Sequence, residues 1–309
     1  MNRRSFLTTL GATAAATSLL RISESQAAAK KRPLTVAEIN DRMFVIAGGG
    51  GNVTVFNSPE GVLLVDGGSP ERSKEVLKLV KQRTGQSRVH TLFNTHWHWD
   101  QTGSNLALGQ AGTQIIAHEN TRLWLSTEVN SKWQNRMYPR LPAKARPTRT
   151  FYTKESLAFG DETIDFGYLP QAHADGDIYV FFRKANVLVV GDIMSVGSYP
   201  ILDYCTNGWL GGMTNATKTL LSVCNPETRI VPGIGPIQAR TDLEAESTML
   251  ATLQLKLSQL LAQGMSARDM LAAAPTREFD SRWGDPSLFI TNAWQGLAFR
   301  ARELGVAIV

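Results

Sequence analysis

The segment Thr95–Gly103 places two histidines and an aspartate directly after a short apolar run, and this combination narrows the folds open to the chain. The run from Val89 to Phe93 predicts a β-strand, so the polar residues lie where a strand meets a loop. His96 and His98 are two residues apart and project the same way from extended backbone, so both imidazoles can reach one ion. Asp100 continues the series on that side. The segment therefore predicts half of a metal site.

Two further polar residues lie at the edges of apolar strand patterns later in the chain. His173 stands in the segment 171–177, and Asp192 follows the apolar run 187–190. A lone His-x-His pattern is more often an accident of core or surface than a ligand pair. The context changes this, because His173 and Asp192 each again lie at the edge of a short apolar strand pattern in the same chain.

Taken in order, these motifs resemble those of the metallo-β-lactamase superfamily. That family shows a strand ending in Asp, then Thr-His-x-His-x-Asp-His, a distant His, Gly-Asp, and finally Pro-Gly-His-Gly-Pro. The resemblance covers roughly residues 40 to 240, and the matching positions are Asp66, then His96, His98 and Asp100, then His173, then Asp192. It implies an α/β fold, the four-layer αββα sandwich, whereas periodicity alone supports only a mixed α/β class.

Two positions depart from the family pattern. Gln101 stands where a further histidine is usual, and Ile234 stands where the last motif has its histidine. In two-metal members the first ion takes the histidines that match His96, His98 and His173, and the second takes the aspartate and the two histidines that are missing here. An amide is a weak ligand and isoleucine is none, so the second position keeps Asp100, with Asp192 as the one further candidate. Such a set of carboxylates suits a hard, loosely held cation.

The first position keeps its whole ligand set. Three neutral imidazoles and a water form the arrangement of a catalytic zinc, which lowers the pKa of that water to about 7. We therefore expect one tightly bound metal, zinc by preference and iron as an alternative. The candidate metal-site residues are His96, His98, His173, Asp100 and Asp192. With one metal, Asp100 would become the candidate catalytic residue, as a general base or as an orienter of water.

Three other residues have structural interpretations. Asp66 closes a strand before Gly67 and is a turn residue or loop organiser, so it is left out of the catalytic set. His118 follows a strand and is expected to cap or pack beside the helix after it. His90 lies inside a strand and belongs to no motif.

The N-terminus has the order of zones found in an export signal. Arg3 and Arg4 precede a mildly apolar stretch at 10–20 and small residues at 27–29. This order favours a twin-arginine signal over a chance arginine pair, with residues 1–29 removed and 30–309 forming one metallo-β-lactamase-fold domain with a C-terminal helical extension. The apolar stretch is too short for a membrane span. Twin-arginine export serves proteins that fold before they cross the membrane. We therefore expect a periplasmic metalloprotein, with the twin-arginine export machinery as a partner.

Net charge and cysteine content limit the classes of partner and the disulfides that we expect. The formal net charge is +5, of which +2 belongs to the predicted signal, and the basic residues are spread along the chain. This excludes a nucleic-acid-binding footprint and leaves a small molecule as the expected substrate. Cys205 and Cys224 could pair after export, but ordinary buried thiols are favoured.

Hydrophobic periodicity predicts two similar halves. Strands are expected at 43–47, 52–57, 61–66 and 89–93 in the first half, and at 162–169, 178–183, 187–191 and 230–231 in the second. Helices are expected at 69–83, 211–223, 239–262, 267–274 and 286–303. The glycine run 48–51 predicts a hairpin loop, which in the family overhangs the metal. Residues 126–150 are expected to form a loop or short helix beside the site mouth, and Trp97 and Trp99 should face away from the ligands.

Three classes of function remain open from the sequence. The first is a periplasmic metal-dependent hydrolase of an ester, lactone, thioester or β-lactam carbonyl. The second is a mononuclear iron oxygenase of sulfur compounds, because two histidines and Asp192 would form a facial triad. The third is a non-catalytic metal or ligand binder in which the second site has been lost.

Overall fold

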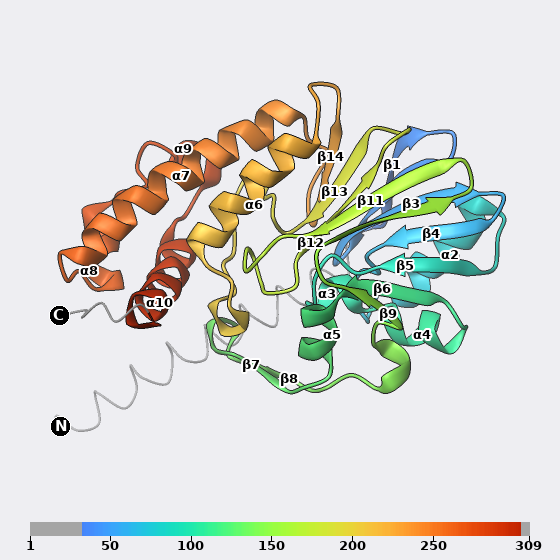
Figure 1. Cartoon of the computed structure of the whole chain (residues 1–309), viewed down its shortest axis with the longest axis horizontal. Helices are drawn as coiled ribbons and strands as arrows, with labels where there is room; N and C mark the ends of the chain where they lie inside the picture. Colours follow the sequence, from blue (N-terminus) through green and yellow to red (C-terminus); the bar gives the residue numbers. More distant parts are fainter. Residues whose placement is uncertain (1–32, 304–309) are drawn as a thin grey trace, which may run out of the picture.

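Two β-sheets form the centre of the molecule (Figure 1), in a computed structural model that describes residues 33–303. The first sheet has the strand order β1-β2-β3-β4-β5-β6-β9 and the second has the order β10-β11-β12-β13-β14. The strands of the first sheet are β1 (Thr35–Asn40), β2 (Met43–Gly49), β3 (Gly51–Ser58), β4 (Gly61–Val65), β5 (Val89–Phe93), β6 (Gln114–His118) and β9 (Arg149–Phe151). Those of the second are β10 (Lys154–Phe159), β11 (Glu162–Tyr168), β12 (Ile178–Phe182), β13 (Val187–Gly191) and β14 (Arg229–Pro232).

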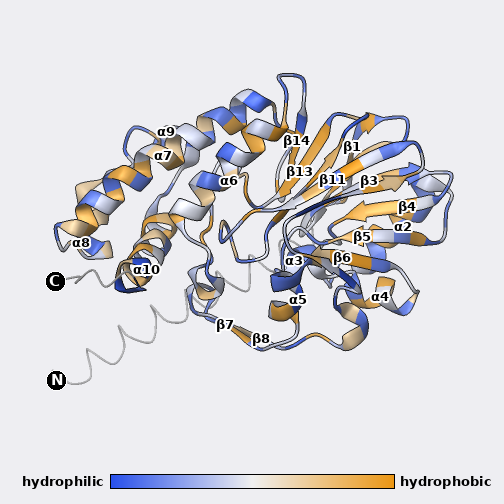
Figure 2. Ribbon diagram, viewed as in Figure 1, coloured by the Kyte–Doolittle hydropathy of each residue, from blue (hydrophilic) through white to orange (hydrophobic). Residues whose placement is uncertain are grey.

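Apolar side chains from both sheets meet in one core. Phe93 of the first sheet lies 4.9 Å from Phe166 of the second between ring centroids, and Phe56 lies 5.7 Å from Phe182. All four rings belong to a single buried cluster. Figure 2 shows hydrophobic residues along the strands of both sheets, as expected for strands that are buried on both faces.

Helices cover the outer face of each sheet. On the first sheet, α2 (Ser73–Thr84) and α4 (Asn105–Gln110) bury Val76 and Leu108 against strand residues. On the second, α6 (Leu210–Val223), α7 (Arg240–Ala262) and α10 (Ser287–Glu303) form the largest apolar cluster, beside α8 (Ala267–Ala273) and α9 (Asp280–Trp283). The layers therefore follow the order α, β, β, α, and the predicted fold class is confirmed. Within residues 33–303 no helix has the length and hydropathy needed to cross a bilayer.

The element boundaries agree with the prediction at most strands and at the long helices. The helix predicted from Ser69 begins four residues later, at Ser73, because the Ser69 amide donates instead to Gly49 O at 2.7 Å. The segment 126–150, predicted as a loop or short helix, contains a two-stranded hairpin of β7 (Val129–Ser131) and β8 (Arg136–Tyr138). Cys205 and Cys224 are both free thiols. The predicted export signal lies outside the described residues.

Candidate metal centre

The site is assembled at one edge of the sandwich, where strands of both sheets end. His96 and His98 follow β5 of the first sheet. His173 lies in the loop between β11 and β12 of the second sheet, and Asp192 follows β13 directly. The Thr95 carbonyl accepts from the Ile178 amide at 2.9 Å, so the two sheets are joined beside the histidines. Residues that are far apart in the sequence thus converge because their strands end at the same edge.

Three histidines and one aspartate form a compact cluster. One ligand atom from each of His96, His98, His173 and Asp192 lies within 4.8 Å of the others. His173 Nε2 is 3.0 Å from His98 Nδ1, and Asp192 Oδ2 is 3.7 Å from His96 Nε2 and 3.6 Å from His173 Nε2. All three imidazoles are buried, whereas the Asp192 side chain is 19% exposed and so lies on the open side.

These distances fit one metal ion. Tetrahedral ligands held about 2.0–2.1 Å from zinc lie about 3.3 Å from one another, which falls between the shortest and longest separations in the cluster. His96 Nε2 is buried and has no hydrogen-bond partner among the described residues. A buried polar atom without a partner is costly, and a metal bond would satisfy it. The cluster can therefore hold one ion through four side chains, one of them at the solvent side.

The far nitrogen of each histidine is held by a hydrogen-bond partner. His98 Nε2 lies 3.0 Å from Asp203 Oδ2, and His173 Nδ1 lies 2.8 Å from the Ile201 carbonyl. His96 Nδ1 lies 3.1 Å from Thr95 Oγ1. Such partners fix the ring orientation and leave the other nitrogen free for a metal.

Asp203 is a functional residue that the sequence analysis missed. Its side chain is fully buried, and it also accepts from Thr206 Oγ1 at 2.6 Å and from Trp133 Nε1 at 2.9 Å. It precedes a single turn of 3₁₀ helix, Tyr204–Thr206, in a long irregular segment with no periodic signal. The only sequence hint would be a carboxylate in the loop between the Gly-Asp motif and the next helix.

The surroundings of the three histidines shift their pKa values. Burial lowers the pKa of His96 well below its usual value, and burial together with the nearby His98 lowers the pKa of His173 to about 4. Both rings are therefore neutral near pH 7, which is the form that binds metal. Burial disfavours the charged form of His98 as well, but the hydrogen bond and charge of Asp203 outweigh it and raise that pKa.

The carboxylates around the cluster have raised pKa values, although the charge of His98 opposes the shift at Asp100 and Asp192. Burial is the main cause of the raised pKa of Asp100 and of Asp192, and the charge of Asp192 adds to it at Asp100. Burial raises the pKa of Asp66 well above its usual range, with further contributions from the charges of Asp192 and Asp100. A bound cation would add positive charge beside these acids and favour their charged forms.

Asp66 organises the loop that carries the histidines, as the sequence analysis expected. Its two carboxylate oxygens accept from the Thr95 amide at 2.8 Å and from Thr95 Oγ1 at 2.7 Å. Its own φ of 64° lies in the left-handed region, so the chain turns sharply after β4. The residue acts on the backbone before His96 and is not part of the cluster.

Asp100 is not part of the four-residue cluster. The alternation that places His96 and His98 together ends where α3 (Trp99–Thr102) begins, because His98 is the residue before that helical turn. Asp100 is the second residue of the turn, so a period of two no longer sets its direction. It remains close enough to Asp192 for the charges of the two groups to interact.

Gln101 and Ile234 determine the character of the second position. Gln101 is fully buried, and its Nε2 donates to Asp192 Oδ1 at 3.4 Å, while its Oε1 has no partner among the described residues. It packs so closely under the β2–β3 turn that a Cβ at Gly51 would lie 2.3 Å from Gln101 Oε1. Ile234 is 56% exposed beside this region. A cavity of about 120 Å³ opens here, lined by residues that include Asp192, Tyr199, Ile201 and Ile234.

The remaining predicted residues have packing roles. Trp97 is buried and faces Leu125, Val129 and Tyr138, with Trp99 packed against the same group. His118 stacks on Tyr168 with 3.7 Å between ring centroids, and its Nδ1 accepts from the Asn120 amide at the start of α5 (Glu119–Leu125). The Trp97 ring also lies edge-on to that of His98, with 4.5 Å between centroids, so Trp97 borders the cluster and does not face away from it as expected. His118 caps a helix.

The sequence profile of the metallo-beta-lactamase superfamily matches residues 46–248. Among curated proteins, a metallo-beta-lactamase type 2 of Bacillus sp. is 24% identical over 187 residues, which span 60% of this chain and 67% of the relative. The alpha subunit of a 2,4-dinitroanisole O-demethylase of Nocardioides sp. is 26% identical over 182 residues, 57% of this chain and 52% of the relative.

Solved structures show the same fold at lower identity. A metallo-beta-lactamase from Pontibacter korlensis superposes with a TM-score of 0.58 at 20% identity and covers 71% of this chain and 99% of its own. A sec-alkylsulfatase from Pseudomonas sp. superposes with a TM-score of 0.65 at 14% identity and covers 89% of this chain and 51% of its own. The second likeness extends over more of this chain than the first.

Proposed function

Because this chain belongs to the metallo-beta-lactamase superfamily of metallo-hydrolases, we propose that it is an exported, mononuclear zinc hydrolase of a carbonyl substrate. The substrate class is an ester, lactone, thioester or β-lactam. One observation carries the proposal: three buried imidazoles and Asp192 lie within reach of a single ion, while Gln101 fills the neighbouring position. Zinc bound there would act as a Lewis acid and lower the pKa of a water.

The chain's own residues then have distinct tasks. His96, His98 and His173 hold the ion, and Asp203 fixes the ring of His98. Asp100 lies at the first turn of α3 beside the cluster, where its carboxylate can accept a proton from the attacking water or orient it. The exposed side of Asp192 faces the small cavity, so a substrate carbonyl can approach from there.

A mononuclear iron site is the second candidate, and one observation favours it. Asp192 Oδ2 lies 3.7 Å from His96 Nε2 and 3.6 Å from His173 Nε2, so two histidines and a carboxylate can face one ion. This is the donor set of non-haem iron oxygenases. The alternative requires iron in the purified protein and oxygen uptake with a sulfur compound as substrate.

Metal analysis separates the candidates. The mature protein, purified without added metal, should contain close to one zinc per chain by mass spectrometry of the elements. Iron in place of zinc would favour the iron oxygenase over the zinc hydrolase. Two tightly held zinc ions per chain would contradict the single-metal site.

Turnover tests the hydrolase itself. The protein is assayed with chromogenic esters, lactones, thioesters and β-lactams. We expect it to hydrolyse at least one of them, and we expect His98→Ala to lose that activity. Asp100→Asn should keep the metal and lower the rate by roughly 10²-fold or more, since positioned general bases contribute about that much. If no substrate shows metal-dependent turnover, the chain is a binder, the third class.

The location is tested separately. We propose that the Arg3-Arg4 pair directs twin-arginine export, after which the chain acts in the periplasm. Fractionation of cells that produce the full chain should recover it in the periplasm, and replacing both arginines with lysine should retain it in the cytoplasm. Recovery of both proteins from the periplasm would contradict this route.

A further inference from the structure

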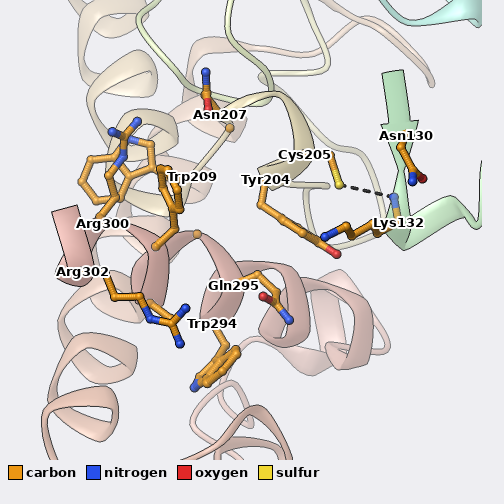
Figure 3. A pocket seen from close by; sticks show the side chains of 14 residues that line it. Asn130, Lys132, Tyr204, Cys205, Asn207, Trp209, Trp294, Gln295, Arg300 and Arg302 are labelled. Atoms are coloured by element: carbon orange, nitrogen blue, oxygen red, sulfur yellow. Dashed lines mark hydrogen bonds between the residues drawn. The ribbon is translucent and has the colours of Figure 1, made fainter. Parts of the chain in front are cut away.

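A second, larger cavity lies between α10 and the segment 203–209. Its volume is about 370 Å³, within the range of roughly 300–1,000 Å³ usual for small-molecule sites. Figure 3 shows Lys132 and Tyr204 on one side, Arg300 stacked against Trp209 on the other, and Gln295 facing the space between them. The lining residues are Asn130, Lys132, Tyr204, Cys205, Asn207, Gly208, Trp209, Trp294, Gln295, Gly296, Ala298, Phe299, Arg300 and Arg302.

All charged side chains that line this cavity are positive. Lys132, Arg300 and Arg302 contribute cations, and none of the described residues that line the cavity is an aspartate or a glutamate. Within residues 33–303, neither Lys132 nor Arg302 forms an ion pair. An anion bound in the cavity would therefore be attracted by the charges of Lys132 and Arg302.

The aromatic part of the lining is fixed in place. The Arg300 guanidinium lies 5.5 Å from the ring centroid of Trp209 and donates to Gln171 Oε1 at 2.5 Å. Trp294 Nε1 donates to the Met265 carbonyl at 3.0 Å. Arg300 also pairs with Glu303 at 2.6 Å, but a guanidinium has five donors, so further donors remain. The flat surfaces of the two tryptophans therefore need little ordering when a ligand binds.

The wall of the cavity is also anchored to the backbone of the metal centre. The Asp203 amide donates to the His173 carbonyl at 2.7 Å, and the Gly208 amide donates to the Asp203 carbonyl at 2.9 Å. The approach is so close that a Cβ at Gly208 would lie 2.0 Å from the His173 oxygen. The cavity residues differ from the cluster residues, so this is a separate site with a rigid wall.

We propose that this cavity binds an organic anion with an aromatic or other apolar body. The acidic group lies between Lys132 and Arg302, and the body packs on Trp209 and Trp294. Arg300 supports the Trp209 ring and offers a further donor. Charged hydrogen bonds give the anion its advantage over a neutral molecule of the same shape.

Calorimetric titration with 2-naphthalenesulfonate tests the proposal, with neutral 2-naphthalenemethanol as the matched probe. We expect the sulfonate to bind at least about tenfold more tightly than the alcohol. Equal affinity of the two probes, or no binding of the sulfonate, would overturn the proposal. The same titration on His98→Ala should give unchanged sulfonate binding, so that a failure of the proposed hydrolase and a failure of this site remain distinguishable.

Variants locate the binding. Lys132→Gln combined with Arg302→Gln should weaken sulfonate binding roughly tenfold or more, and Lys218→Gln on the exposed face of α6 should leave it unchanged. Gln295→Glu is a second test at an exposed position, because it adds a carboxylate to the cavity at almost constant shape. This variant should bind the sulfonate more weakly and bind the alcohol with unchanged affinity. Unchanged sulfonate affinity in either lining variant would place the binding elsewhere.

Discussion

The two metal positions of this fold differ in how their residues are supported. At the first position, His98 and His173 each have the far nitrogen held by a fixed acceptor, Asp203 or the Ile201 carbonyl. At the second, the side-chain amide of Gln101 has one long hydrogen bond to Asp192, and its Oε1 lacks a partner among the described residues. Of the two positions, only the first therefore has its candidate ligands together with groups that orient them.

The strongest test of this comparison is to remove a ligand from the complete unit. His173→Ala should reduce tightly bound metal from about one ion per chain to almost none, because no described side chain can replace its Nε2. Elemental analysis after dialysis measures the change. His118→Ala is the matched control, since His118 is a helix cap away from the cluster, and it should keep its metal. Full metal retention in His173→Ala would mean that the ion lies elsewhere.

The next test weakens the support and leaves the ligands in place. Asp203→Asn should lower metal affinity about 10–100-fold, because the neutral amide no longer fixes the ring of His98 by a charged hydrogen bond. Competition with a chromogenic chelator measures the affinity. Asp161→Asn is the control, because Asp161 is an exposed carboxylate paired with Arg42 and Lys184.

The thermal unfolding midpoint of the metal-free Asp203→Asn protein distinguishes a local effect from general loosening. A midpoint close to that of the unchanged chain, together with weaker metal binding, identifies Asp203 as a positioning residue. Equal metal affinity in the Asp203 and Asp161 variants would remove Asp203 from that role.

The complete and the incomplete position also differ in how well the sequence predicts them. His96, His98, His173 and Asp192 were predictable because each follows an apolar strand whose end the periodicity locates. Asp203 was not, because it meets His98 across 105 positions from a segment without periodicity. Asp100 was expected on the side of the histidines, and it lies in the turn of α3, outside the four-residue cluster but close enough for its charge to interact with Asp192, His98 and His173.

The same distinction applies to the fold. β5 and β13 have five residues each, which is long enough to show a pattern, and their bounds were predicted. β1 and β10 have six residues each but were not predicted. The hairpin of β7 and β8 has three residues in each strand, which is too short for a period to appear. The first turn of α2 was misplaced because Ser69 pairs with the β2–β3 turn, a tertiary contact that local signals do not contain.

Rebuilding the second position should have a smaller effect. Gln101→His combined with Ile234→His places imidazoles at both missing ligand positions, next to Asp100 and Asp192. We expect metal content to rise above one ion per chain when zinc is supplied, with the added ion more weakly held because no fixed acceptors orient the new rings. Ile234→His alone is the control, and it should stay near one ion. No gain in the double variant would show that the pocket itself has changed, since Gln101 fits tightly against Gly51.

The smallest expected effect concerns the segment that follows Asp192. Glu246 of α7 is buried and accepts from the Ser195 amide through both oxygens, at 3.1 and 3.2 Å. Burial raises its pKa from the usual 4.5 to about 8, although that hydrogen bond and the charge of Arg282 oppose the shift. The folded state therefore binds this proton more tightly than the unfolded chain does. Its contribution to stability is present below about pH 4.5 and is lost as the pH rises toward 8.

Glu246→Gln should remove this pH dependence, because the amide stays neutral and its oxygen can still accept from Ser195. Thermal unfolding should show similar midpoints for the two proteins at pH 5, and the variant should be more stable at pH 9 by an amount on the order of a few kcal/mol. The control is Glu244→Gln, an exposed residue of the same helix paired with Arg240. If the curves of Glu246→Gln and the unchanged chain stay parallel from pH 5 to 9, Glu246 is not protonated in the folded protein. The segment after Asp192 would then be held by a buried charge, a second respect in which this side of the site differs from the neutral imidazoles opposite.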